Sequence, residues 1–419
     1  MNIDELFEKR DQFYLAPSQA GKMAIYGALV VGLCLIGAGF SLVDEARTVW
    51  GTILFNLFFF FCLGLGGIGV SAILDVVGAV WARPIKRIWE AFGAFVPVAA
   101  ICFSLFLVAV YFNIGGAQAV YSWIVDPGVV EHFYGKNVWL QGGFMVVRNL
   151  FVLAAITLFA LWQLKWSVGR DMAFVKGDRA EATRLGLEAK ARLSYWGGGA
   201  LIVYGVGLTF FGMDLMMSLS PLWFSTLFGG WQFAILMQTL FAFTLICLFK
   251  LKSTNLGSLI SQPHFHDCGK IMHGFTVFFA YTTYAHILTY WYGNMPEETE
   301  YFIHRIHEPW IYLLFVIPVI AFVIPLYSLV FKAAKWTWWV TIPLASMILF
   351  GQWLTNMLVV MPEVMDASNG VGYMPVAAVG SFLFFLGLFL TTFFWFAKRY
   401  PMVGLADPLL PAALEEGHH

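Results

Sequence analysis

The residues most able to do chemistry in this chain are a few polar side chains within long apolar stretches. Arg148 lies in the middle of the apolar stretch 138–164. A permanent charge at membrane depth requires a partner, a water-filled cavity or a polar ligand. Asp214 and His286 lie in two other apolar stretches, and Asp75 ends a further one. Guanidinium, carboxylate and imidazole groups can move protons or orient a polar ligand, so these residues are our first candidates for a functional site.

Each candidate also has a purely structural explanation. Arg148 can form an ion pair or cap a helix rather than line a proton path or the polar end of a ligand cavity. Asp75 and Asp214 lie near the expected membrane interfaces, where snorkelling or capping would account for them. His286 is either a satisfied core histidine or a donor to a ligand carbonyl, and a reference pKa of about 6.5 also suits it to proton transfer. Asp75 and His273 would extend such a proton route inward.

The elements that position these side chains must be membrane-spanning helices. The chain has 419 residues, of which 60% are hydrophobic and only 12% charged, and its mean hydropathy is +0.76. One helical span takes about 20 apolar residues. Continuous apolar runs, unlike the alternation of barrel strands, predict an all-α polytopic membrane protein with about ten transmembrane helices. The ten runs are 23–43, 50–74, 91–112, 138–164, 195–217, 223–249, 271–292, 310–331, 337–361 and 374–397.

The distribution of Lys and Arg predicts the orientation of these helices. The two termini and the even-numbered loops hold 20 of the 24 Lys and Arg residues, and the odd-numbered loops hold three. This asymmetry places both termini in the cytoplasm. We therefore expect a cytoplasmic N-terminal segment at 1–22, a membrane domain at 23–397 and a cytoplasmic tail at 398–419.

The sequence argues against a redox centre bound by this chain alone. Its five cysteines include no CxxC pair, so we expect no iron–sulfur cluster. The two histidines within spans, His273 and His286, lie on one helix about 20 Å apart, which disfavours a bis-histidine haem. The glycine run 64–69 follows no strand, so it predicts close helix packing rather than nucleotide binding. We expect no haem, metal or nucleic acid, and any redox cofactor to be lipid-soluble or held by a partner.

Two further features concern the outer side and the eighth span. The loop 293–309 carries four glutamates and two histidines against one arginine, a composition that suits docking of an extracytoplasmic partner. Pro318 and Pro325 predict a kink in the eighth span, whose freed carbonyls would line a cavity. In the ninth span, Gln352 and Asn356 share one face because they are four residues apart.

Several segments of the chain resemble the NrfD/PsrC-like membrane subunits of respiratory oxidoreductases. The closer resemblance is to the ten-helix subunits of alternative complex III and of the Qrc-type menaquinone reductase complex. Together the segments cover most of the chain, and the most specific is WYGNMPEETE. The segments are 291–300, 214–226, 264–270, 81–90 and the arginine within the fourth span.

The resemblance implies a fold and a set of partners. It implies two four-helix bundles plus peripheral helices, in a bacterial cytoplasmic (inner) membrane. It also implies an extracytoplasmic (periplasmic) iron–sulfur subunit, a molybdopterin-oxidoreductase-like subunit and a multihaem cytochrome c. Such a subunit is not catalytic alone, but it belongs to a quinone oxidoreductase complex.

With this resemblance, we expect menaquinone near the outer surface, with coupled proton movement. The residues that we expect to contact it are Arg148, Asp214, His286, Asn294, His132 and Trp139.

Two other functions remain compatible with the sequence. A secondary transporter would also have many helices, a kinked span and buried charge, and it would be expected to show paired interrupted helices in two inverted halves. No clear pair of this kind is visible. A purely structural membrane anchor for a peripheral enzyme is the second alternative.

Overall fold

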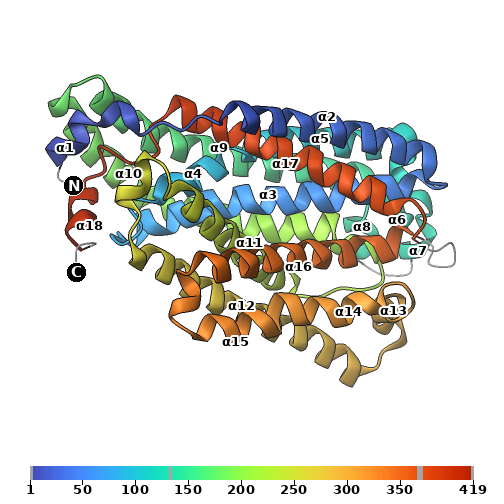
Figure 1. Cartoon of the computed structure of the whole chain (residues 1–419). Coiled ribbons are helices and arrows are strands. Elements are labelled where there is room, and N and C mark those ends of the chain that lie inside the picture. The colour runs from blue at the N-terminus through green and yellow to red at the C-terminus, as the bar shows by residue number, and fades with distance from the viewer. Residues whose placement is uncertain (1–2, 132–134, 366–370, 417–419) are drawn as a thin grey trace.

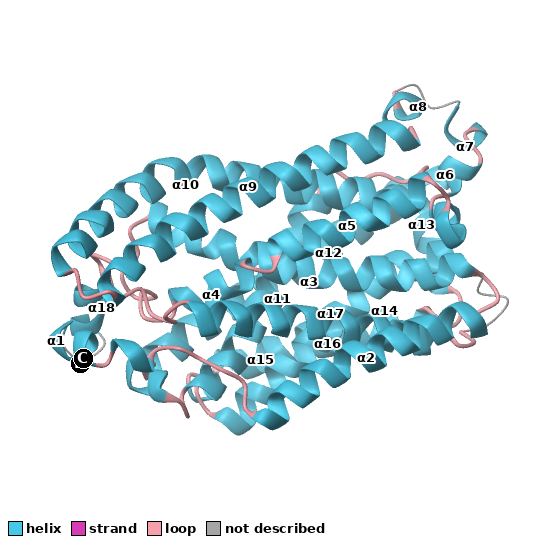
Figure 2. Cartoon of the chain, turned by 90° about the horizontal axis from the view of Figure 1, so that it is seen from above, coloured by secondary structure: helices cyan, strands magenta, loops and turns pink. Residues whose placement is uncertain are grey.

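The chain is an all-α polytopic membrane protein. The computed structural model describes residues 3–131, 135–365 and 371–416, and within these ranges it is helical without a β-strand (Figure 2). Nine helices in the described ranges are long and apolar enough to cross a membrane. The seventh predicted span lies in α12 (Gln262–Gly293), which has 32 residues but a more polar composition. Both termini lie at one end of the molecule (Figure 1), as ten crossings require.

The helices form two bundles of four, as predicted. In each bundle, neighbouring helices contact one another around a ring. Bundle one consists of α3 (Ala46–Val76), the α4–α5 pair (Lys86–Gly93 and Val96–Tyr111), α9 (Gly142–Val175) and α10 (Arg179–Leu215). Bundle two consists of α11 (Phe228–Leu251), α12, the α14–α15 pair (Ile311–Pro318 and Ile324–Val330) and α16 (Trp338–Val364). We call the end that carries the termini the inner end and the opposite end the outer end.

Two peripheral helices complete the fold. α2 (Gln19–Leu42) packs along α17 (Met374–Arg399), and α17 packs on α3. Figure 2 shows the α9–α10 hairpin at the opposite edge of the molecule. α3 contacts both bundles, and it is the most deeply buried of the nine apolar spans. It is therefore the central helix of the molecule.

The glycine run of α3 permits a close helix contact, as predicted. A Cβ at Gly67 would overlap the Trp89 carbonyl oxygen, and one at Gly64 would lie 3.3 Å from the Phe92 carbonyl oxygen. The short helix α4 therefore lies directly against the backbone of α3. Ordinary side chains at these two positions would force the helices apart.

The eighth span is interrupted between its two prolines. A turn of π-helix at Val319–Val323 separates α14 from α15, as expected for a helix with disrupted backbone hydrogen bonds. One carbonyl of this turn is satisfied by a neighbouring helix, because Gln238 Nε2 of α11 donates to Ala321 O at 2.8 Å. The kink is thus fixed by a side chain of α11.

Candidate functional site

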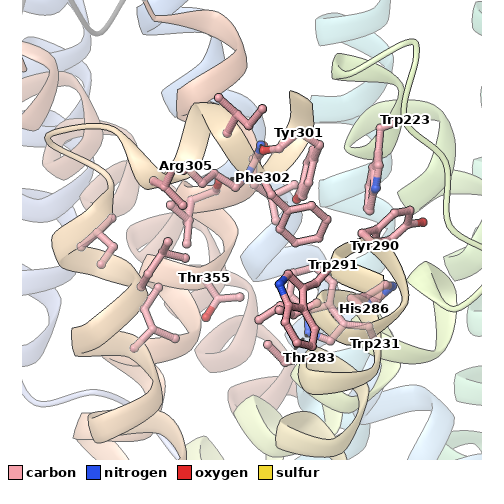
Figure 3. A pocket seen from close by; sticks show the side chains of 18 of the residues that line it. Trp223, Trp231, Thr283, His286, Tyr290, Trp291, Tyr301, Phe302, Arg305 and Thr355 are labelled. Carbon is pink, nitrogen blue, oxygen red and sulfur yellow. Dashed lines mark hydrogen bonds between the residues drawn. The ribbon is translucent and has the colours of Figure 1, made fainter. Parts of the chain in front are cut away.

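A cavity of about 400 Å³ lies in the outer half of bundle two. It is lined mainly by α11, α12, α14, α16 and α13 (Pro296–Ile306). In Figure 3 the side chains of α12 face those of α13 across the opening. We call it the aromatic cavity, since seven of its lining residues are large aromatics. These are Trp223, Trp231, Phe279, Tyr290, Trp291, Tyr301 and Phe302.

Local sequence explains how this cavity forms. Thr283, His286 and Tyr290 follow one another at spacings of three and four along α12, so they share one helix face. α12 ends at Gly293, and Asn294 adopts a left-handed conformation with φ of 47°, which asparagine tolerates better than most residues. Pro296 then starts α13 with a favourable fixed φ. The turn brings α13 back over the face of α12 that carries His286.

His286 lies on the wall of the cavity in a polar contact of its own. Its Nε2 is 2.8 Å from Ser225 Oγ, and the residue also hydrogen-bonds with the backbone of Thr282. The Trp231 ring meets the imidazole edge-on, with centroids 5.7 Å apart. The ring is therefore fixed in orientation, with a hydroxyl that can exchange hydrogen-bonding roles with it.

The indole N–H of Trp223 is a donor whose hydrogen bonding is incomplete. Its Nε1 is buried without a well-formed hydrogen-bond partner in the described part of the chain, although the Tyr290 hydroxyl lies near it. The Trp223 ring stacks on Tyr301, with centroids 3.9 Å apart and planes at 7°. Leaving a buried donor unpaired costs roughly 1–3 kcal/mol. A ligand carbonyl in the cavity would remove this cost.

Arg305 fixes α13 onto α16. Its Nη1 lies 2.8 Å from Glu363 Oε1, its Nη2 donates to Val359 O at 2.8 Å, and its Nε donates to Leu358 O at 3.1 Å. On the other side of Glu363, His304 Nδ1 lies 3.7 Å from Oε2. The nearby Glu363 carboxylate raises the pKa of His304 above its ordinary value, against the opposing effects of burial and Arg305.

Arg148 and Asp214 lie together at the outer end of bundle one. Arg148 Nε and Nη2 contact the two carboxylate oxygens of Asp214 at 2.5 and 2.8 Å. Asn149 and Trp139 also donate to that carboxylate, at 2.8 and 2.9 Å. The guanidinium packs over the rings of Trp139 and Phe144. Three of the residues that we expected to contact a cofactor thus form a cluster separate from the aromatic cavity.

Asp75 belongs to a buried charge network at the inner end. Asp75 Oδ1 lies 2.7 Å from Arg83 and 2.6 Å from Lys86. The network continues through further ion pairs to the C-terminal tail. We call it the inner network, which has four cations and four carboxylates: Arg83, Lys86, Arg87, Arg170, Asp75, Glu90, Asp171 and Asp407.

The tail carboxylate of this network is strongly acidic. Burial alone would raise the pKa of Asp407, but the charges of Arg170, Lys86 and Arg83 outweigh burial and hold that pKa well below its ordinary value. Asp407 is therefore ionised at any physiological pH, and its ion pairs with Arg83 and Arg170 fasten the tail to the segment before α4 and to the inner end of α9.

The remaining predicted site residues are Asn294, His273 and His132. Asn294 lines the aromatic cavity. His273 lies in the inner half of α12, and its Nδ1 has no hydrogen-bond partner among the residues that the structure describes. His132 lies outside the described residues. The structure thus brings together only His286 and Asn294 of the predicted site residues at the aromatic cavity.

Sequence reasoning missed several residues of this site. Trp223 and Ser225 occur in segment 214–226, which we considered only for its resemblance. Arg305 is the one arginine in an outer loop with four glutamates, and that isolation was an available signal. Tyr301 and Glu363 carried no comparable sequence signal, since their roles depend on how α13 packs against α16.

Comparison with known proteins gives no match, either to a family model or to a curated protein.

Proposed function

We propose that this chain is the menaquinone-binding membrane subunit of a multisubunit respiratory oxidoreductase. The observation that carries the proposal is the aromatic cavity. Its volume of about 400 Å³ lies in the range of cavities for small ligands, which are mostly apolar with a few placed polar groups. A flat naphthoquinone headgroup would stack between its aromatic walls.

Two polar positions suit the two carbonyls of such a headgroup. Trp223 Nε1–H is a buried donor without a well-formed partner in the described ranges, so it would donate to one carbonyl. The His286–Ser225 pair would provide a hydrogen bond to the other. A bound menaquinone supplies two-electron, two-proton redox chemistry, while the chain orients the ring and keeps bulk water away.

Access from the bilayer is consistent with a lipid-soluble ligand. Trp291 and Ile287 line the cavity but are 75% and 48% exposed, so we place its opening on the side of α12 that would face lipid. An isoprenoid tail would leave through this opening into the acyl chains. A soluble substrate would instead need an opening toward water.

The partners in this proposal are the ones that the resemblance implies. A periplasmic iron–sulfur subunit would dock on the outer end, together with a molybdopterin-oxidoreductase-like subunit and a multihaem cytochrome c. The position of the aromatic cavity beneath α13 supports this arrangement, because a headgroup there would lie close to a partner on the outer face. The membrane would be the bacterial cytoplasmic membrane.

Trp223→Phe tests this proposal. It keeps the ring but removes the N–H, so we expect it to weaken binding of radiolabelled menaquinone by about threefold to tenfold, the value of one hydrogen bond. The binding is measured on the detergent-solubilised complex. Trp339→Phe is the matched control, because Trp339 is 65% exposed on α16 and does not line the cavity.

Three other results would count against the role of Trp223 or favour a different function. Equal menaquinone affinity in both variants would remove Trp223 from the site. Partner subunits that co-purify without quinone binding would favour the structural anchor. Substrate-dependent uptake by the isolated chain, with no partner and no quinone, would favour the transporter.

A further inference from the structure

A second cavity of about 250 Å³ lies beside the aromatic cavity, at the outer end. We call it the polar cavity, because Ser220, Glu300, His304 and Glu363 are among its lining residues. A volume of this size greatly exceeds the roughly 10–15 Å³ that one water molecule requires. It is therefore large and polar enough to be hydrated.

The two cavities share part of their walls. Trp223 and Tyr301 line both cavities, and their rings stack against each other. Helix α13 separates the two spaces, with Arg305 in the lining of the aromatic cavity and His304 in that of the polar cavity. Both residues contact Glu363, so one carboxylate links the groups on the two sides.

We propose that the polar cavity is the proton outlet of the aromatic cavity and that His304 is its proton-carrying group. This inference rests on the proposed function. Oxidation of a quinol yields two electrons, which the partner iron–sulfur chain would take, and two protons. Each proton leaves a quinol hydroxyl at the shared wall, where Glu363 contacts both Arg305 and His304. The imidazole of His304 takes up these protons one at a time and releases each through the polar cavity to water on the outer side. Reduction uses the same groups in reverse.

The surroundings of His304 suit this role. Glu363 lies 3.7 Å from Nδ1 and Glu300 lies 3.8 Å from Nε2, while Arg305 is the opposing charge. The Glu363 and Glu300 carboxylates stabilise the imidazolium and raise the pKa of His304 above its ordinary value, and an imidazole can both accept and release a proton. The His304 side chain is 44% exposed, which gives it contact with outer water. Glu363 is a positioning residue, because Arg305 holds it ionised and fixed in place.

Chemical rescue tests this inference in the intact complex in liposomes. We expect His304→Ala to retain the wild-type amount of menaquinone but to slow quinone-linked electron transfer about tenfold at neutral pH. Imidazole added to the outer buffer should restore the rate in proportion to its concentration, since the cavity left by the side chain is accessible. His307→Ala is the matched control, because His307 is an exposed histidine three residues away, and we expect neither effect.

A second variant separates proton transfer from hydrogen bonding. His304→Gln keeps a polar side chain but cannot carry a proton, so it should be as slow as His304→Ala. An unchanged rate in either variant, or loss of menaquinone from His304→Ala, would overturn the inference while leaving the quinone site standing. Absence of menaquinone from the wild-type complex would instead refute the proposed function, and the inference with it.

Discussion

Arg148 shows how a single charge at membrane depth is accommodated. Its side chain makes a two-pronged contact with Asp214 and donates to the Trp139 carbonyl at 2.6 Å. Such geometry offsets much of the cost of removing both charges from water. The cluster therefore ties α9 to α10 near the outer end.

Removing one member of this pair should destabilise the protein more than removing both. Arg148→Gln leaves the Asp214 carboxylate buried and uncompensated, so we expect a loss of roughly 3–5 kcal/mol in the free energy of unfolding. The double variant with Asp214→Asn should recover part of that loss. Thermal unfolding of the detergent-solubilised protein measures both.

A matched control for this pair is available on the surface. Arg47 pairs with Glu45 at 2.6 Å, but both side chains are more than a third exposed, so Arg47→Gln should have little effect. If Arg148→Gln and Arg47→Gln change the thermal stability equally, the Arg148–Asp214 pair does not stabilise the bundle.

For individual residues, the sequence identified the charges within apolar stretches but not the side chains that pair with them. Arg148 and Asp214 stood out because an apolar neighbourhood makes any charge costly. The two additional donors to Asp214, from Asn149 and Trp139, depend on how α9 begins after a short helix, which no periodicity specifies. For the same reason Trp223 looked like one of many interfacial tryptophans until the cavity around its ring was known.

Among the helices, α3 and α4 make a contact that leaves no room for a side chain at Gly67. The Gly67 Cα faces the Trp89 carbonyl, whereas a Cβ at Gly69 would meet nothing within 4 Å. The two glycines lie two residues apart on the same helix, so they form a natural pair for comparison.

Gly67→Ala should therefore destabilise the protein, by about 1–3 kcal/mol, because overpacking forces α4 away from α3. Gly69→Ala adds the same methyl group in open space and should be neutral or slightly stabilising, since alanine favours helix. Thermal unfolding of the two variants side by side measures the difference. Equal stability would mean that α4 can shift without cost.

Sequence patterns predicted the helices well and their interruptions only in part. The run 310–331 and its two prolines predicted a kinked span, and the structure has a π-helical turn there. The side chain that satisfies the turn, Gln238, comes from a helix that ends about 70 residues earlier. Similarly, the span 271–292 was predicted, but the return of α13 over α12 was not, because its packing depends on the tertiary contact between Arg305 and Glu363.

In the whole molecule, the buried ion pairs gather at the two ends of an apolar body. The inner network balances four cations with four carboxylates and includes Asp407 from the tail. The outer end holds the Arg148 cluster and the two adjoining cavities. Composition and the Lys and Arg distribution predicted the topology because lipid imposes length and charge rules on every span. They could not predict the inner network, whose members are spread between residues 75 and 407.

If the proposed function is right, menaquinone occupies the aromatic cavity of bundle two. The most direct test is a photoreactive menaquinone analogue added to the intact complex, with the labelled peptides identified by mass spectrometry. We predict labelling of residues 223–231 and 283–302, suppressed by an excess of unmodified menaquinone. Labelling confined to the Arg148–Asp214 cluster of bundle one, or labelling that menaquinone does not suppress, would contradict it.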